Sequence, residues 1–336
     1  MSRLLIYGVT GATGLRLAEL AVDAGIAPIV AGRRRDEVAS IASRLDCEAR
    51  TATLPEVGTI FDDVSVVASC VGPYTHYGLP VLDAAMKNGA SYLDLTGEAR
   101  YVQRLLTDYD APARAAGITL VPSAGLGLTS SIAARAAVGV LDGPVEKITI
   151  GYQPRGMRPS TGTLRSTVEL IAGGAAVVEK GQVRFVSPGR RLRRTPAGLG
   201  TLFPLTDPLT MHTMWPDADI SGYFVSRAAP LMSPVLMGVR LAGLTAIGVL
   251  RLVEKRISGD DDPGGGFRVA VAASGGGQTR VSIVDMDDIY ELTSRAALEV
   301  SRCLLDGVQP GVRASGSVVG DPTEVARRIG VRLSVR

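Results

Sequence analysis

Residues 3–35 read RLLIYGVTGATGLRLAELAVDAGIAPIVAGRRR, and this stretch decides the fold. The apolar run at 3–7 predicts a strand, and the amphipathic stretch at 12–24, closed by Gly25, predicts a helix. A second apolar run at 28–31 predicts another strand. A strand, a glycine turn, a helix and a strand in this order form a βαβ unit, which is typical of a parallel sheet.

The same alternation continues to residue 121. The run VSVVASC at 64–70 is rich in β-branched valine, as buried parallel strands usually are. The remaining expected elements are helices at 36–45, 79–88 and 99–116 and strands at 91–95 and 118–121. This repeated pattern predicts a Rossmann-type α/β fold for the first part of the chain.

Beyond Pro122 the pattern changes, and a chain of 336 residues is long enough for a second domain at roughly 150 residues each. Residues 182–219 carry many prolines and arginines without a clean period, so no element is assigned there. The elements expected elsewhere are a helix at 130–141, a strand at 145–152, a loop at 260–263, a hairpin at 267–285 with the tip SGGG, and helices at 289–305 and from Asp321.

The loop GVTGATG at 8–14 follows the first strand directly and has the spacing GxxGxxG. Glycines at these positions permit a tight turn, let the backbone approach a pyrophosphate and let the helix pack on the strand. The free N–H groups of the helix N-terminus then favour phosphate. A glycine turn without a ligand is the alternative. The βα context favours a dinucleotide site at Gly8, Thr10, Gly11, Ala12, Thr13 and Gly14.

The end of the second strand indicates which dinucleotide is bound. NAD enzymes usually place an acid there, about 20 residues past the glycines, to bind the ribose hydroxyls. This chain reads AGRRR at 31–35 instead. Guanidinium groups attract a 2′-phosphate that an acid would repel. Arg33 and Arg34 therefore predict NADP(H), and a solvated basic start to the next helix is the alternative.

The motif SCVGPYTHYGLP at 69–80 lies where the strand 64–70 ends. Ligands of open parallel sheets bind beyond the carboxyl ends of the strands. We therefore expect the nicotinamide side to be lined by Ser69, Cys70, Val71 and Gly72. Tyr74 and Tyr77 are candidate proton donors, and a rigid loop with structural aromatic residues is the alternative. Cys70 is expected to be a small buried apolar residue and no nucleophile.

A further motif, YLDLTGE at 92–98, ends the next strand. Asp94 is interpreted as a buried carboxylate with satisfied hydrogen bonds. Glu98 is a third candidate proton donor, with a helix-capping role as the equal alternative.

Together these motifs resemble the saccharopine dehydrogenase-like oxidoreductases, and within them the branch that includes trans-acting enoyl reductases. That branch carries a YGxTGxxG start, a CVGPYxxYGxPV block and a YxDLTGE block, and the chain matches all three within residues 7–98. It departs where the family has a GFDSIPSD-like segment, because residues 122–130 read PSAGLGLTS without an acid. The stretch STGT at 160–163 is similar to a glycine–threonine element of the family.

The resemblance implies two domains: an NADP-binding Rossmann domain over 1–125 plus about 289–336, with returning C-terminal helices, and an α+β substrate and dimerisation domain over about 126–288. It implies NADP(H) as cofactor and hydride transfer to a conjugated C=C (enoyl) or C=N bond. The substrate is then a small molecule, a lipid or a polyketide-type acyl group. We also expect a homodimer.

Two other functions remain to be weighed. A short-chain dehydrogenase needs a YxxxK pair, and none of the four lysines has a tyrosine four residues before it, which disfavours that class. A non-catalytic NADP-binding sensor or scaffold is the main alternative, because fold alone does not establish function.

Composition excludes several partners. The net charge of +3, from 36 basic and 33 acidic residues, disfavours nucleic acid. Three spaced cysteines and two histidines disfavour a metal site and indicate a reducing, cytoplasmic setting. Residues 231–253 are apolar but interrupted, so no transmembrane segment is expected. A buried or dimer-interface helix is favoured there, and a helix making peripheral lipid contact is the alternative.

Overall fold

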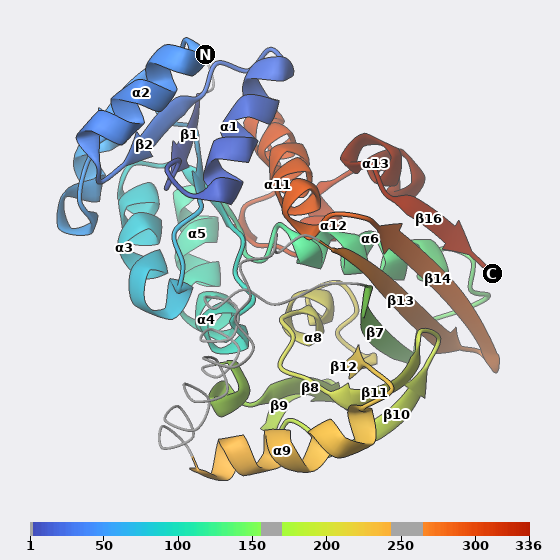
Figure 1. Ribbon diagram of the computed structural model, residues 1–336. Coiled ribbons are helices and arrows are strands. Elements are labelled where there is room, and N and C mark those ends of the chain that lie inside the picture. Colours follow the sequence, from blue (N-terminus) through green and yellow to red (C-terminus); the bar gives the residue numbers. More distant parts are fainter. Residues whose placement is uncertain (1–2, 156–169, 243–264) are drawn as a thin grey trace. The chain divides into compact units, whose positions relative to one another are not determined.

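The computed structural model describes residues 3–155, 170–242 and 265–336 (Figure 1). Internal contacts divide the chain into two compact units. The first unit comprises Met1–Thr96, Arg100–Leu128 and Tyr290–Gly330, and the second comprises Gly97–Ala99, Thr129–Ile289 and Val331–Arg336. The segments 160–163, 243–253 and 260–263 discussed above lie outside the described residues.

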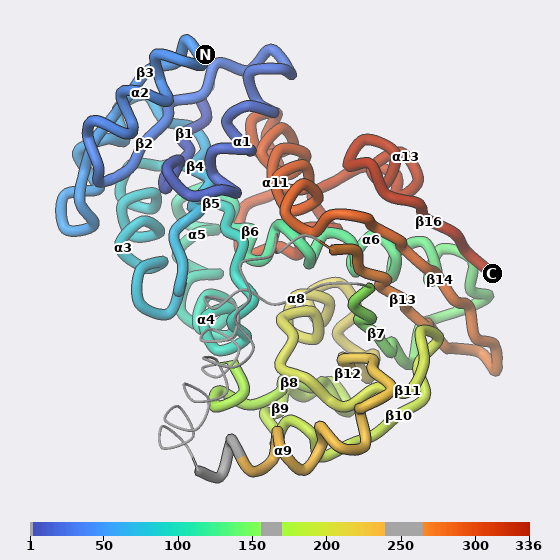
Figure 2. The backbone as a smooth tube through the Cα atoms, viewed as in Figure 1, coloured from blue at the N-terminus to red at the C-terminus, as the bar shows by residue number. Residues whose placement is uncertain are grey.

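A parallel sheet forms the centre of the first unit. Among the described residues it has seven strands: β1 (Leu4–Tyr7), β2 (Ile29–Gly32), β3 (Glu48–Thr51), β4 (Val66–Ser69), β5 (Ser91–Asp94), β6 (Thr119–Val121) and β15 (Gly311–Val312). Their order is β15-β6-β5-β4-β1-β2-β3. Figure 2 shows six of these strands across the unit, in the order β3, β2, β1, β4, β5 and β6. Because the chain order reverses between β1 and β4, the crevice beyond their carboxyl ends is the topological switch point.

Helices cover both faces of this sheet, which explains why all four residues of β1 are buried. The described helices of this part of the chain are α1 (Ala12–Asp23), α2 (Arg35–Leu45), the 3₁₀ helix η1 (Leu54–Ile60), α3 (Tyr74–Lys87), α4 (Ala99–Arg104), α5 (Asp110–Ala116), α11 (Ile289–Asp306), α12 (Ser315–Val318) and α13 (Pro322–Ile329). The expected Rossmann-type α/β fold is confirmed.

Two local differences from the expected elements have physical reasons. Helix α3 begins at Tyr74, five residues before the expected start, because a helix passes through Gly78 and Pro80 that propensity alone would exclude. The expected helix at 99–116 contains a π-helical turn, η2 (Leu105–Tyr109). Pro112 in the next turn lacks an N–H, and a π turn accommodates such a break.

The second unit contains a mixed sheet. Its strands are β7 (Lys147–Arg155), β8 (Ala175–Glu179), β9 (Gln182–Val186), β10 (Leu192–Thr195), β11 (Gly198–Leu202), β12 (Asp219–Val225), β13 (Gly266–Gly275), β14 (Gln278–Met286) and β16 (Arg332–Val335). Strand β12 pairs parallel with β7, and the other pairs are antiparallel. The expected hairpin at 267–285 is confirmed as β13 and β14, joined at Gly276 and Gly277.

Among the described residues, three helices lie wholly or mostly in the second unit: α6 (Leu126–Val138), α8 (Asp207–His212) and α9 (Ala229–Ala242). The stretch 182–219, which the sequence left unassigned, contains β9, β10, β11 and α8. Within the described ranges, no helix combines the length and the hydropathy that crossing a bilayer requires.

Candidate functional site

The turn between β1 and α1 presents unused backbone donors at the carboxyl edge of the sheet. Gly8 has a φ of 95°, and its N–H donates to Ala31 O at 2.8 Å, which joins the turn to β2. Gly11 is the N-cap of α1, its side-chain position offers no capping bond, and no acid lies in the first helical turn. The N–H groups at this end of the helix therefore favour an anion.

The three glycines of the turn serve different purposes. A Cβ on Gly14 would lie 2.5 Å from Gly8 O, and one on Gly8 would lie 2.7 Å from Val71 Cγ2. Both residues therefore let the turn, α1 and the end of β4 pack closely. A Cβ on Gly11 would meet only Gly8 O, at 3.5 Å. Gly11 thus leaves open space above the helix end, where a phosphate would fit.

A cleft of about 540 Å³ runs along this edge within the first unit. Its volume lies in the usual range for cofactor sites, roughly 300–1,000 Å³. The residues that line it are Tyr7, Gly8, Thr10, Gly11, Gly32, Arg33, Arg34, Thr53, Leu54, Pro55, Cys70, Val71, Gly72 and Tyr77. Of the residues expected to bind the cofactor, the lining omits only Ala12, Thr13, Gly14 and Ser69.

The two arginines of the cleft differ in their ion pairs. Arg34 forms an ion pair with Glu37 at 2.9 Å. Arg33 is exposed and has no ion pair with any residue in the described ranges. Burial raises the pKa of Tyr7, and the nearby positive charge of Arg33 partly opposes this effect. Arg33 is therefore a cation available to a ligand beside the first strand.

Strand β4 brings Ser69 and Cys70 to the same edge. Ser69 is fully buried, and its Oγ has no hydrogen-bond partner among the described residues. Burial raises the pKa of the Cys70 thiol to about 12, with a further contribution from the charge of Asp94. Cys70 is a neutral thiol at physiological pH, so the structure gives it no nucleophilic character.

Tyr74 is the first residue of α3 and lies buried beneath the cleft. Its hydroxyl donates to Ser69 O at 2.9 Å and accepts from Leu95 N at 3.3 Å. Burial, and then the charge of Asp94, raises the pKa of Tyr74 well above its usual value. Tyr74 thus braces the ends of β4 and β5, and the structure does not bring it into the cleft lining.

Tyr77 lies one turn further along α3 and lines the cleft with 43% of its surface exposed. Its ring centroid lies 6.2 Å from that of His76. Glu98, the third candidate donor, is partly buried and lies in the short segment Gly97–Ala99 that groups with the second unit. Only Tyr77 of the three candidates contributes to the cleft in the first unit.

The burial expected of Asp94 is confirmed, and the structure shows hydrogen bonds to its Oδ1. It is fully buried at the end of β5, where its Oδ1 accepts hydrogen bonds from Thr96 N and Ser123 N, both at 3.0 Å. The carboxylate therefore joins the segments that follow β5 and β6.

Five residues of the cleft were not expected from the sequence, namely Tyr7, Gly32, Thr53, Leu54 and Pro55. Thr53, Leu54 and Pro55 follow β3, a polar strand with the sequence EART that gives no apolar period. The strand was therefore missed, and with it the segment that it places opposite Arg33. A TLP turn at the end of a third βα unit is the one sequence feature that could have indicated them.

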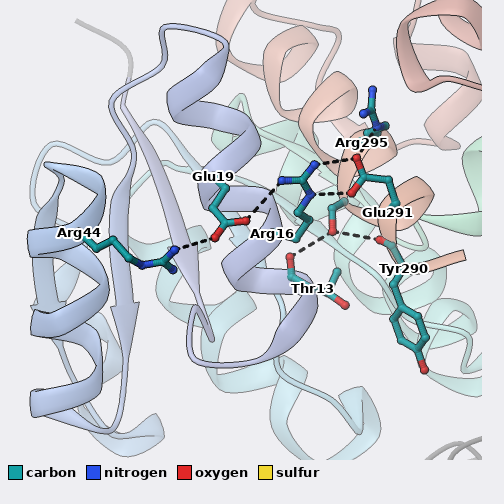
Figure 3. A network of polar contacts seen from close by, with 8 residues as sticks. Thr13, Arg16, Glu19, Arg44, Tyr290, Glu291 and Arg295 are labelled. Carbon is teal, nitrogen blue, oxygen red and sulfur yellow. Dashed lines mark hydrogen bonds and ion pairs between the residues drawn. The ribbon is translucent and has the colours of Figure 1, made fainter. Parts of the chain in front are cut away.

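A polar network fixes α1 to α11 in the first unit (Figure 3). Arg16 donates to both carboxylate oxygens of Glu291, at 2.6 and 2.9 Å, and Arg295 donates to the same carboxylate at 2.7 Å. The hydrogen bond from Arg16 is the main reason that the pKa of Glu291 falls to about 2. Ser294 Oγ lies 3.2 Å from Thr13 O and donates to it, so α11 also contacts the glycine turn.

The second unit has its own buried polar group, formed by Ser130, Tyr152 and Asp207. Ser130 Oγ and Tyr152 OH both donate to Asp207 Oδ1, the latter at 2.8 Å. Burial raises the pKa of Asp207, and these two hydrogen bonds oppose the effect. In the described part of the chain, no group of His, Cys, Asp and Glu side chains has the arrangement of a metal site.

Curated relatives match part of this chain. Over 195 residues, the chain is 29% identical to a saccharopine dehydrogenase-like oxidoreductase from Homo sapiens and to another from Bos taurus. The chain resembles saccharopine dehydrogenase-like oxidoreductases. Each match covers 49% of this chain and 45% of the relative, so the chain spans less than half the length of these curated relatives. No family model matches the chain.

A relative from Mycobacterium tuberculosis is named as a trans-acting enoyl reductase. It is 35% identical over 132 residues, which cover 36% of this chain and 32% of the relative. Apo saccharopine dehydrogenase (L-Glu forming) from Saccharomyces cerevisiae has the same fold, with a TM-score of 0.64 at 13% identity over 100% of this chain and 99% of that one. The expected resemblance, including its enoyl reductase branch, is confirmed.

Proposed function

We propose that this chain is an NADP(H)-dependent oxidoreductase that transfers hydride to a conjugated C=C or C=N bond. The observation that carries the proposal is that one cleft contains both the open N-terminus of α1 and Arg33, which has no ion pair with a described residue. One end of the cleft suits a pyrophosphate, and the other offers a cation where no acid would repel a 2′-phosphate. The oxidoreductase names of the curated relatives support the same assignment.

Different residues of the cleft would bind different parts of the cofactor. The backbone around Gly8 and Gly11 would hold the pyrophosphate, and Arg33 would hold the 2′-phosphate. Cys70, Val71 and Gly72 would line the nicotinamide side. Bound NADPH would supply the hydride, so the chain itself needs to supply orientation and a proton.

Reduction of a C=C bond adds one hydride to one carbon and one proton to its neighbour. We propose Tyr77 as the group that delivers this proton, because it is the candidate hydroxyl that lines the cleft. Its exposure lets solvent return the proton to the phenolate afterwards. Tyr74 is a poor donor, since its O–H is held by Ser69 O and a buried phenolate would be costly.

The substrate proposal rests on the relatives alone. The enoyl reductase from Mycobacterium tuberculosis favours a conjugated C=C bond in an acyl or polyketide-type substrate. A C=N bond of a small molecule is the other substrate class that the proposal includes. We also retain a homodimer and a cytoplasmic location as proposals. A relative from Caenorhabditis elegans is named a lipid droplet localized protein, so location needs its own measurement.

The test separates cofactor binding from chemistry. Calorimetry should detect binding of NADPH and weaker binding of NADH, and absorbance should then record NADPH oxidation with a panel of enoyl thioesters and cyclic imines. Gly11→Val is the matched variant, because its Cβ would meet Gly8 O only at an ordinary contact distance of 3.5 Å and its side chain would enter the open space above α1. It should abolish binding while circular dichroism stays unchanged.

Each alternative gives a different result in this test. Binding without turnover across the panel would favour the sensor or scaffold function. Absence of binding to either dinucleotide would overturn the proposal as a whole.

A further inference from the structure

Helix α9 in the second unit has an apolar face that the described residues leave uncovered. Leu231 and Val235, four residues apart, are 75% and 62% exposed. Pro234 and Gly238 lie on the same face, and both are exposed. Burial within the same domain is therefore ruled out for Leu231 and Val235, and the two remaining interpretations are a dimer-interface helix and a helix that contacts lipid.

The opposite face of α9 packs against β10 and β11. Leu236 is buried, and Ser233 Oγ lies 2.7 Å from Thr201 Oγ1 of β11. Gly189 packs directly against the backbone of Ser233, where a side chain would not fit. Figure 1 shows α9 lying along β10 and β11, the strands that it contacts. The exposed face is therefore presented by a fixed helix and does not result from a loosely held segment.

The neighbouring strands β10 and β11 also carry exposed residues, on the side of the sheet that α9 contacts. Leu192 and Arg194 alternate along β10 on the side of Thr201, and Leu199 of β11 is paired with Arg194. All three are exposed. We define the α9 patch by the residues Arg190, Leu192, Arg194, Leu199, Arg227, Leu231, Val235 and Met237.

All charged residues of the α9 patch are arginines, so the patch is positively charged. Arg190, Arg194 and Arg227 are exposed and have no ion pair with any residue that the structure describes. Residues 187–202 and 226–242, which include every residue of the patch, contain no aspartate or glutamate. An apolar stripe flanked by arginines is the arrangement by which interfacial helices bind anionic lipid surfaces.

We propose that the α9 patch binds the surface of an anionic lipid bilayer, with Leu231 and Val235 entering the interface and the arginines contacting lipid phosphates. A second copy of the chain fits less well, because a two-fold contact would place like-charged arginines against each other. An anionic bilayer complements them instead. This inference is independent of the cofactor cleft, since every residue of the patch lies in the second unit.

The experiment is co-sedimentation of the full chain with vesicles of phosphatidylcholine alone or mixed in equal parts with phosphatidylglycerol. The wild-type chain should bind the mixed vesicles and release them at high salt. Leu231→Asp combined with Val235→Asp should lower the partition coefficient at least about tenfold. Arg194→Gln should lower it about fivefold, the equivalent of about 1 kcal/mol for one basic residue at an anionic surface.

Val140→Asp is the matched control, because Val140 is 48% exposed in the same unit but lies outside the patch. It should bind vesicles like the wild type. Circular dichroism and NADPH affinity should be unchanged in all variants, which separates this test from that of the cofactor site.

Two results would overturn the inference. One is that the wild-type chain does not bind the mixed vesicles. The other is a double variant that converts a dimer to a monomer in analytical ultracentrifugation without changing vesicle binding, which would make the patch a contact between copies.

Discussion

Replacing Glu291 with glutamine tests how strongly the C-terminal helix α11 holds α1. The lowering of its pKa from the usual 4.5 to about 2 corresponds to about 3 kcal/mol, at about 1.4 kcal/mol per pKa unit. The side chains of Arg16 and Glu291 are still 38% and 29% exposed, so solvent screening reduces this value. We expect Glu291→Gln to lower the free energy of unfolding by about 1–2 kcal/mol near neutral pH.

The stabilisation by Glu291 is expected to decrease as the pH falls. Because the folded-state pKa of Glu291 lies below the unfolded-state value, the carboxylate stabilises the fold above about pH 4.5, and this contribution is lost as the pH falls toward about 2. Urea unfolding followed by circular dichroism should show a difference between wild type and variant that is constant above about pH 5 and shrinks below it.

Glu324→Gln is the matched control. Glu324 pairs with Arg328 at 3.2 Å on α13, and its side chain is 61% exposed, so a loss of only a few tenths of a kcal/mol is expected, about as for other exposed pairs. The reasoning fails if the two variants are equally stable, or if the effect of Glu291→Gln is the same at every pH.

Three further outcomes concern the cleft. Arg33→Ala should weaken NADPH binding about 10- to 100-fold with NADH unaffected, whereas Arg34→Ala, which removes a residue already paired with Glu37, should have little effect; calorimetry with both dinucleotides decides. Tyr77→Phe should lower turnover at unchanged thermal stability, and Tyr74→Phe should lower the unfolding free energy by about 1–2 kcal/mol; equal turnover in both variants would end the proton-donor proposal. Gly14→Ala should destabilise the chain by about 1–3 kcal/mol in urea, because its Cβ would contact Gly8 O.

The parts of the fold that could be predicted are those whose neighbours in space are neighbours in sequence. Strands β1, β2 and β4 follow from continuous apolar runs, and Gly25 marks the end of α1. Strand β3 has the polar sequence EART and lies at the edge of the sheet. It is extended because it pairs with β2, and its own sequence does not indicate a strand. Pattern reasoning therefore missed it.

The candidate site shows the same division. The arginines after β2 and the glycine turn were found because each lies within one βαβ unit, and the structure places them in one cleft. The two tyrosines of α3 could not be distinguished beforehand, since both belong to one motif. Their roles separate only when Tyr74 is seen to turn its hydroxyl toward Ser69 and Leu95 while Tyr77 faces the cleft.

By itself the sequence determined the class of fold, the glycine turn and the basic end of the second strand, because local periodicity and local charge are sufficient for these. Tertiary structure alone decided three other features. It brought Glu291 to Arg16 across 275 residues, and it separated the buried Tyr74 from the exposed Tyr77. It also left Leu231 and Val235 of an apolar helix uncovered. Burial and pairing depend on which distant segments pack together, and no local pattern contains that information.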